Sequence, residues 1–218
     1  MLKKNDFVWL LTLFAIVGFL LYPSTHSLFI LLNKAHPYLM GIIKFSILAT
    51  MGELLALRLT SGDWKKPTGL IYRAIIWGFL GMVFVLVFDL FFGGVANSTR
   101  NGLLPNYGNL GGAFFTSLLM NFLFGPTFMA FHRITDTYID LGEGNLKKIF
   151  SISLIDVIKA IDWYGFISFV VLKTVPFFWV PAHTITFLLP AEYRVLAAAF
   201  LSIALGAILA FAKRRNVK

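Results

Sequence analysis

The stretch "LIYRAIIWGFLGMVFVLVFDLFFGGV" (residues 70–95) decides the class of fold. It runs for 26 residues with two charged side chains, Arg73 and Asp89. A helix that crosses a bilayer needs about 20 predominantly apolar residues. A helix on the surface of a soluble protein would instead carry polar residues along one whole face. The stretch therefore predicts a transmembrane helix.

The composition of the whole chain agrees with this interpretation. Of its 218 residues, 58% are hydrophobic and 13% are charged, and the mean hydropathy is +0.81. Soluble globular domains carry about 25% charged residues. The chain has no cysteine, which excludes a disulfide framework, a thiolate metal site and a cysteine nucleophile. The fold class expected is an all-α integral membrane protein.

Six apolar stretches are long enough to span a bilayer, and together they predict one multi-pass domain over residues 1–218. The first is interrupted by "YPSTHS" (residues 22–27), where Pro23 is expected to kink the helix or divide it. The predicted spans are residues 7–32, 37–59, 70–95, 110–131, 161–180 and 184–212.

The long segment between the fourth and fifth spans predicts an additional helix. Its apolar residues recur at helical spacing, and a helix lying along the membrane surface fits them better than another span. These residues are Ile149, Ile152, Leu154, Ile155 and Ile158.

The distribution of cations predicts the orientation. Six crossings place both termini on one side, and 14 of the 19 Lys and Arg residues fall in the segments of that side. Because positively charged loops stay inside, both termini are expected in the cytoplasm. The net charge of +9 then indicates anchoring at the membrane surface rather than binding to nucleic acid. The membrane expected is the bacterial cytoplasmic membrane, with an organelle inner membrane as the alternative.

No pattern indicates an enzyme. The chain lacks the HExxH, Gly-x-Ser-x-Gly and phosphate-loop motifs, and its four histidines stand in separate segments. No catalytic residue, cofactor or metal site is expected.

Polar residues inside the spans are the informative ones, because they are unfavourable in lipid and usually face protein or water. At 100° per residue, three spans carry a stripe that combines small and polar residues. Two interpretations stay open: polar contacts that hold helices together, or a polar path through the bundle. The stripes are Ala49, Gly52, Glu53 and Ala56; Gly78, Gly81, Val85, Asp89 and Phe92; and Ser117, Asn121, Gly125, Phe128 and His132.

The segment "FFWVPAHTITFLLPAEYR" (residues 177–194) predicts a break between the last two spans, because Pro181 and Pro190 interrupt helical hydrogen bonding. His183, Glu192 and Arg194 are then expected to line the outer mouth of the bundle. The alternative is a tight turn with interfacial aromatic anchors.

Two charges are expected at similar depth in the outer half of the bundle. Lys44 and Asp89 each lie six or seven residues from the outer end of a span, which suggests a charge pair or a shared hydrated vestibule that Arg194 joins. The alternative is that Lys44 reaches the headgroups by itself.

Several segments resemble the 22-kDa peroxisomal membrane protein family and its mitochondrial inner-membrane relatives, here as a member of prokaryotic type. In "NKAHPYLMGIIKFSILATMGELLALRL" (residues 33–59), the His36-Pro37 and Met51-Gly52 pairs match the family pattern. "MNFLFGPTF" (residues 120–128) retains Pro126, and residues 177–194 keep the family's order of Trp, Pro, Phe, Pro and Arg. The resemblance covers residues 35–212 and departs from the family at its Asp-Gln pair, where Met120 and Asn121 stand.

The resemblance implies a channel or pore for small solutes. A non-transporting structural or assembly protein of the membrane is the alternative, and a secondary transporter has less support. The expected partners are the lipid bilayer and small polar solutes or ions, with a homo-oligomer left open. The residues expected along a polar path are Lys44, Glu53, Asp89, Asn121, His132, His183 and Arg194.

Overall fold

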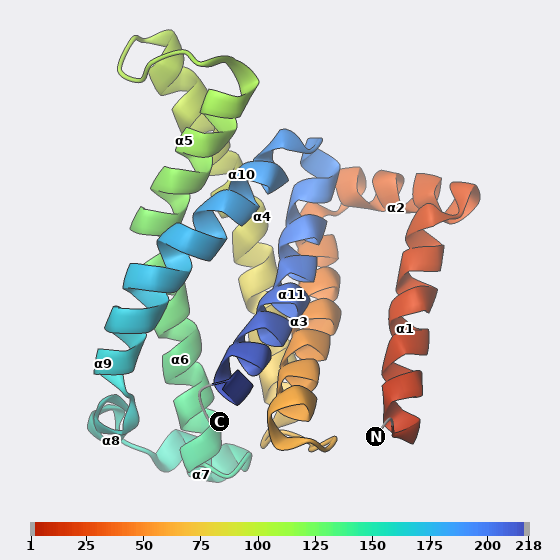
Figure 1. Cartoon of the computed structure of the whole chain (residues 1–218), viewed down its shortest axis with the longest axis vertical. Helices are drawn as coiled ribbons and strands as arrows, with labels where there is room; N and C mark the ends of the chain where they lie inside the picture. Colours follow the sequence, from red (N-terminus) through yellow and green to blue (C-terminus); the bar gives the residue numbers. More distant parts are fainter. Residues whose placement is uncertain (1–2, 216–218) are drawn as a thin grey trace.

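The computed structural model describes residues 3–215, and this part of the chain is built from helices with no strand. Figure 1 shows the long helices standing side by side, which confirms the prediction of an all-α fold. The helices are α1 (Lys4–Leu21), α2 (Pro23–Ala35), α3 (Pro37–Ser61), α4 (Leu70–Arg100), α5 (Gly108–Leu123), α6 (Gly125–Leu141), α7 (Leu146–Ser151), α8 (Leu154–Ala160), α9 (Trp163–Gly165), η1 (Phe166–Trp179), α10 (Val180–Leu188) and α11 (Ala191–Arg215).

Five of the described helices are long and apolar enough to cross a membrane. They are α1, α3, α4, the continuous helix Trp163–Leu188 and α11 over Ala191–Ile208. The pair α5 and α6 passes the same test as a unit bent by 44°, which makes up to six. The helix α1 begins and α11 ends at the same end of the bundle, called here the terminal end; the opposite end is called the distal end (Figure 1).

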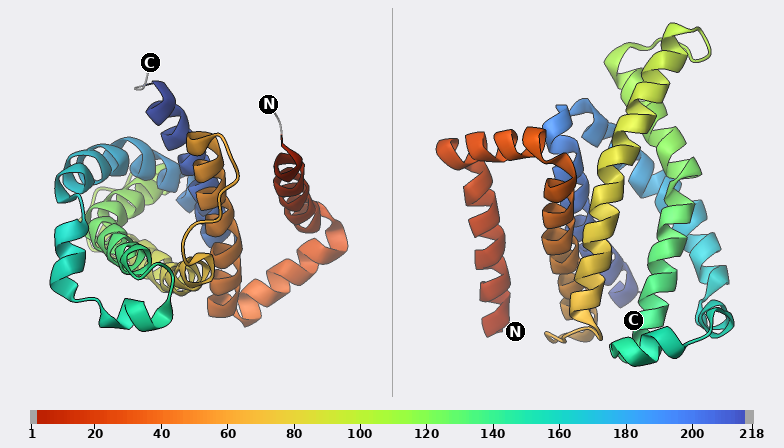
Figure 2. Two further views of the ribbon diagram at one scale, coloured as in Figure 1. Left: turned by 90° about the horizontal axis from the view of Figure 1, so that it is seen from below. Right: turned by 180° about the vertical axis from the view of Figure 1, so that it is seen from behind.

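Pro23 divides the first predicted span, as expected, but only one of the two pieces has the length to cross. The helix α1 ends at Leu21, and α2 begins at Pro23, whose missing N–H suits the first turn of a helix. From there α2 lies across the distal end (Figures 1 and 2). The predicted span over residues 7–32 is therefore wrong in its second half.

The helix α1 is joined to the bundle near the terminal end. Arg58 donates from Nε to Asp6 Oδ1 at 2.8 Å, and Trp9 Nε1 donates to the Met51 carbonyl oxygen at 3.1 Å. No residue of α1 is buried, and Figure 2 shows it standing apart from the other long helices. The packed core consequently lies among α3, α4, α5, α10 and α11.

The contact between α3 and α4 depends on glycine. A Cβ atom at Gly81 would lie 2.3 Å from the Gly41 carbonyl oxygen, so only glycine permits the approach of the two backbones. Ser46 Oγ donates to the Ala74 carbonyl oxygen at 3.0 Å across the same interface. Small residues at helix crossings are the usual way to achieve close packing in a membrane.

The segment 177–194 differs from the prediction, because the chain stays helical through Pro181. The preceding stretch η1 has π-type hydrogen bonding and contains Pro176. Its wider turns leave backbone positions without the usual i−4 bond, which is where prolines are tolerated. The helix ends at Leu188, and α11 begins after Pro190. The predicted boundaries at residues 180 and 184 are therefore wrong.

The segment predicted to form one surface helix forms two short helices, α7 and α8, at the terminal end (Figure 1). Asn145 caps α7, and Ser153 caps α8 by accepting a hydrogen bond from the Asp156 backbone N–H. The cap at Ser153 starts a new helix instead of extending the first one. Phe150 and Ile155 are exposed on these helices, as a contact with lipid would require.

The arrangement makes a testable prediction about orientation. The terminal end carries most of the cations, so Asn5→Cys and Lys147→Cys should resist a membrane-impermeant thiol reagent in intact cells, because positively charged ends stay inside. Asn101→Cys, after the end of α4, should react. The native chain has no cysteine and serves as the blank. Labelling of Asn5→Cys from outside would refute this orientation.

A second prediction concerns the glycine contact. Gly81→Val forces a side chain against Gly41 and Phe45 and should lower the free energy of unfolding by about 1–3 kcal/mol, measured in detergent micelles. Gly93→Val is the matched control, because a Cβ at Gly93 on the same helix meets no atom within 4 Å. Equal stability of the two variants would mean that the close approach of α3 and α4 contributes nothing.

Candidate functional site: an aromatic cavity with two polar ends

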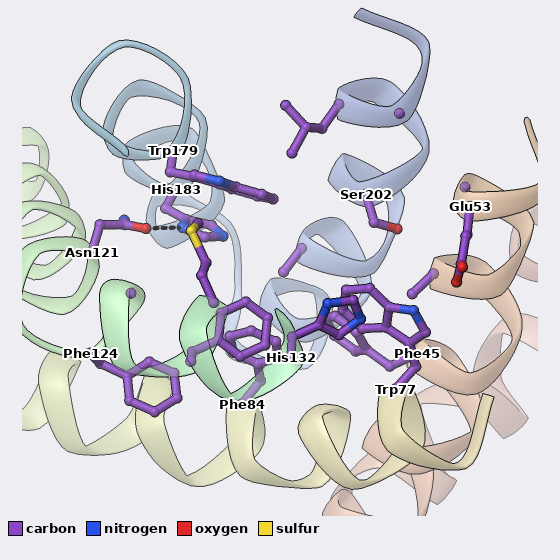
Figure 3. Close-up of a pocket in the computed structure, with 18 of the residues that line it drawn as sticks. Phe45, Glu53, Trp77, Phe84, Asn121, Phe124, His132, Trp179, His183 and Ser202 are labelled. Atoms are coloured by element: carbon purple, nitrogen blue, oxygen red, sulfur yellow. Dashed lines mark hydrogen bonds between the residues drawn. The ribbon is translucent and has the colours of Figure 1, made fainter. Parts of the chain in front are cut away.

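A cavity of about 250 Å³ lies inside the bundle, between α3, α4, the bent pair α5 and α6, the helix that ends in α10, and α11 (Figure 3). Typical pockets for drug-sized ligands measure about 300–1,000 Å³, so this cavity suits a smaller molecule. Its walls are formed mainly by aromatic and small residues, with polar groups gathered at two places.

The aromatic walls form one contiguous group. Phe84 packs against Phe45 with ring centroids 4.9 Å apart and against Phe128 at 4.7 Å. Offset and edge contacts of this kind are favourable beyond the area that they bury. The middle of the cavity is thus apolar, and the rings present both faces and edges to whatever occupies it. The aromatic residues of the lining are Phe45, Trp77, Phe84, Phe124, Phe128 and Trp179.

The first polar end is a hydrogen-bonded chain between α5 and α10. Ser117 Oγ donates to the Val180 carbonyl oxygen at 2.7 Å, and Asn121 Nδ2 donates to the Ser117 carbonyl oxygen at 2.8 Å. Asn121 Oδ1 lies 3.1 Å from His183 Nδ1 (Figure 3). Asn121 and His183 are 3% and 5% exposed, so these bonds replace contacts with water.

The hydrogen bonds of Asn121 fix the tautomer of His183. Because the amide nitrogen of Asn121 is used in donating to Ser117, its Oδ1 must accept from His183, and Nδ1 carries the proton. Neutral His183 then presents Nε2 as an acceptor, and this nitrogen has no partner among the described residues. The Trp179 ring stacks on His183 with centroids 5.1 Å apart and leaves its own Nε1 without a partner.

The second polar end is centred on Arg73 of α4. Its NH1 lies 3.1 Å from Glu53 Oε1 and 2.9 Å from Asp136 Oδ1, and its NH2 donates to Asp140 Oδ1 at 2.6 Å. His132 Nδ1 lies 3.5 Å from Asp136 Oδ2. Three carboxylates therefore share one buried guanidinium, while Glu53 Oε2 and His132 Nε2 are buried without a hydrogen-bond partner.

The structure brings four of the seven predicted residues to this cavity. Asn121 and His183 form one polar end, and Glu53 and His132 belong to the other. The predicted stripe Ala49, Gly52, Glu53 and Ala56 lines the cavity in full. In the stripe from α5 and α6, Ser117 alone does not line it.

The predicted position of His183 at the outer mouth is wrong. Because the helix continues through Pro181, His183 is carried inside the bundle to Asn121. Of the two interpretations of the stripe on α4, its glycines fit the contact between helices: Gly78 and Gly81 face α3, where their size is needed. The residues with which α4 lines the cavity are Trp77 and Phe84.

The remaining three predicted residues lie at a second cavity, of about 400 Å³, near the distal end. Lys44, Asp89 and Arg194 all line it, together with Asn33 and Glu192. The direct pair of Lys44 and Asp89 is not formed. Lys44 Nζ donates to Asn33 Oδ1 at 2.6 Å, because α2 lies across this end and brings Asn33 to it. Glu192 forms an ion pair with Lys34, whose Nζ lies 3.4 Å from Glu192 Oε1.

Sequence reasoning missed Arg73, Asp136 and the aromatic walls as parts of the site. The signal for Arg73 is a cation inside an apolar run, which needs partners. Asp136 lies four residues after His132, on the same helical face, and spacing could have found it. The aromatic residues carry no such signal, since phenylalanine is abundant throughout the chain.

Comparisons with known proteins give no relative: no family model, no curated protein and no solved structure matches the chain. The resemblance to the 22-kDa peroxisomal membrane protein family stays a prediction. Within residues 3–215, no group of three or more His, Cys, Asp or Glu side chains is placed to hold a metal ion.

The pair of Asn121 and His183 makes a testable prediction. Asn121→Leu keeps a similarly branched side chain but leaves His183 Nδ1 without an acceptor in a buried place, which should lower the free energy of unfolding by about 1–3 kcal/mol. The measurement is thermal or denaturant unfolding in micelles.

Two further variants test the cause of that loss. Asn109→Leu, which is exposed on the same helix, should change little. The double variant Asn121→Leu with His183→Phe removes both partners and should be less destabilised than the sum of the two single changes, because no buried group is left unpaired. Strictly additive effects would show that the two side chains are not energetically coupled.

Proposed function

We propose that this chain is an integral membrane protein with six crossings and that it passes small solutes through the central cavity, as a channel or pore. The observation that carries the proposal is the cavity itself. It lies inside a bundle of helices of membrane-spanning length, and polar side chains from α3, α5, α6 and α10 line its two ends. Ionisable and amide groups inside spans usually line paths for solutes or ions.

The two polar ends divide the path into steps. Near the terminal end, the cluster around Arg73 reaches the surface through Asp140, whose side chain is 58% exposed. Near the distal end, the second cavity contains the charged groups of Lys44, Asp89 and Arg194. Phe88 separates the two cavities: it lines the distal one, and its ring lies 5.6 Å from that of His183 in the central one. Passage requires Phe88 to move, so this arrangement corresponds to a closed state.

The direction and place follow from charge and hydropathy. The cations gathered at the terminal end favour the cytoplasm for both termini and, with them, a bacterial cytoplasmic membrane. The resemblance to the 22-kDa peroxisomal membrane protein family implies the same class of function. No enzymatic reaction and no cofactor enter the proposal.

A second candidate function is a structural or assembly protein of the membrane. The observation that favours it is the pairing of Glu53 with Arg73, which satisfies a charge within the bundle by joining α3 to α4. The close contact of Gly41 and Gly81 serves the same purpose. In this case the cavity would be a space between helices with no solute in it.

Solute flux in liposomes separates the two functions. Purified protein should accelerate the entry of small uncharged solutes, followed by light scattering as the vesicles swell. Gly125→Leu should reduce this rate at least about tenfold, because the new side chain fills part of a cavity that is already too small for large molecules. Gly125 is buried in the lining, and a Cβ there meets no atom within 4 Å, so the helices need not shift.

Gly93→Leu is the matched control, since this exposed glycine also meets no atom within 4 Å. It should conduct as the native chain does. Vesicles that stay tight with the native protein, or equal flux through Gly125→Leu and native protein, would refute conduction through this cavity and leave the structural function.

A further inference from the structure

We infer that the central cavity takes an elongated organic cation: an ammonium group at the cluster around Arg73, an apolar body along the aromatic walls and a hydroxyl group near His183. The inference rests on the proposed function in one respect, since it names the class of solute for the same cavity. Three independent features of the lining support it.

The first feature is the charge at the terminal end of the cavity. Arg73 supplies one positive charge, whereas Glu53, Asp136 and Asp140 supply three carboxylates. Asp140 is largely in contact with solvent, but the side chains of Glu53 and Asp136 are only 21% and 16% exposed. Two largely buried carboxylates therefore share one nitrogen of Arg73. Arg133 adds a second positive charge near Asp136, so the three carboxylates, when ionised, are one positive charge short. A ligand with a positive charge would supply it, and an anion would be repelled.

The second feature is the pair of unused acceptor positions at this end. Glu53 Oε1 is bound to Arg73, whereas Glu53 Oε2 and His132 Nε2 are buried with no hydrogen-bond partner. Trp77 Nε1, which lies near the Glu53 carboxylate, is a buried donor that is unpaired as well. Buried polar atoms are normally paired, so an unpaired carboxylate oxygen indicates that something outside the chain completes it. An ammonium group donates hydrogen bonds and carries the matching charge.

The third feature is the aromatic wall next to the carboxylates. Trp77 lies against His132 with centroids 4.2 Å apart, and Phe45 and Phe84 continue the wall (Figure 3). Phe128 belongs to the same wall and packs against Phe84. The face of an aromatic ring attracts a cation, and tryptophan does so best. Aromatic rings combined with a carboxylate form the usual site for organic ammonium compounds, whereas a hydrated metal ion would gain little from these apolar walls.

The other polar end determines the length of the ligand. His132 and Asn121 are eleven residues apart on the bent pair α5 and α6, which corresponds to about 16 Å of helix or somewhat less after the bend. His183, 5% exposed, presents Nε2 as an unpaired acceptor there, and Trp179 Nε1 is an unpaired donor. A hydroxyl group of the ligand can donate a hydrogen bond to His183 Nε2 or accept one from Trp179 Nε1. The ligand is thus an amino alcohol whose two polar groups are joined by an apolar chain.

The test compares three probes with one apolar chain and one shared hydroxyl: 8-amino-1-octanol, 1,8-octanediol and 8-hydroxyoctanoate. Binding to the purified protein is followed by tryptophan fluorescence, because Trp77 and Trp179 line the cavity. The amino alcohol should bind at least about tenfold more tightly than the diol, and the hydroxy acid should bind more weakly than both. This comparison uses the native chain and does not depend on any variant folding.

Variants test which residues cause the preference for the amino alcohol over the diol. Glu53→Gln should reduce the ratio between amino alcohol and diol to about one, and Asp136→Asn should reduce it in the same direction, while Glu143→Gln, an exposed carboxylate at the terminal end, should leave it unchanged. His183→Phe should weaken the amino alcohol and the diol by a similar factor. The inference is overturned if the diol or the hydroxy acid binds as tightly as the amino alcohol. It is also overturned if Glu53→Gln leaves the ratio of the two affinities unchanged, or if the amino alcohol does not bind.

Vesicle flux distinguishes this inference from the proposed function. If the protein conducts uncharged solutes through the cavity and shows no preference for the amino alcohol, the cation site is refuted and the pore stands. If the amino alcohol binds in a manner that requires Glu53 and the vesicles stay tight, the site stands and conduction is refuted.

Discussion

The structure depends on one buried guanidinium, that of Arg73. Its Nε donates to the Thr68 carbonyl oxygen, which holds the start of α4, and its terminal nitrogens contact carboxylates from α3 and α6. Removal of an arginine in such a place would leave several carboxylates unpaired at once, and a buried charge without a partner is strongly unfavourable. Arginine fits this role better than lysine, because its five donors lie in a fixed plane and can serve several acceptors. The geometry of the terminal end of the cavity is therefore set by Arg73.

Away from Arg73, small residues determine how closely α3, α4 and α11 approach one another. From Arg73, α4 runs toward the distal end with Gly78 and Gly81 against α3, and α3 in turn places Gly52 against the backbone of Ser202 on α11. Gly41, Gly78 and Gly81 make the close contact between α3 and α4, and Gly52 makes the contact between α3 and α11. Phe45, which adjoins Gly81, and the neighbouring Trp77 and Phe84 lie beside the contact of α3 with α4 and form walls of the cavity. The glycines thus occupy the contacts between helices, and the larger side chains beside them surround the cavity.

The sequence predicted the elements well and the directions of their faces less well. The apolar runs identified the long helices, and Pro23 identified the division between α1 and α2, because both signals are local. Glu53, Asn121 and His132 were found because a polar residue in an apolar run is unusual. The stripe on α4 left two interpretations open, because helical periodicity gives a face but not the neighbour that the face meets. A stripe of small residues can adjoin another helix or a cavity, and only the contacts of Gly81 with Gly41 decide between them.

The placement of His183 shows why the remaining part could not be derived from local signals. Two prolines predict a break, and the break is present, but at Pro190 alone. Pro181 is accommodated because η1 precedes it, and the π-type hydrogen bonds of η1 leave the position of Pro181 without the usual i−4 bond, so no N–H is needed there. That continuity moves His183 from the distal surface to the inside of the bundle, where Asn121 orients its ring and fixes its proton. A single backbone irregularity, which no side-chain pattern announces, therefore decides whether this histidine belongs to a loop or to the cavity.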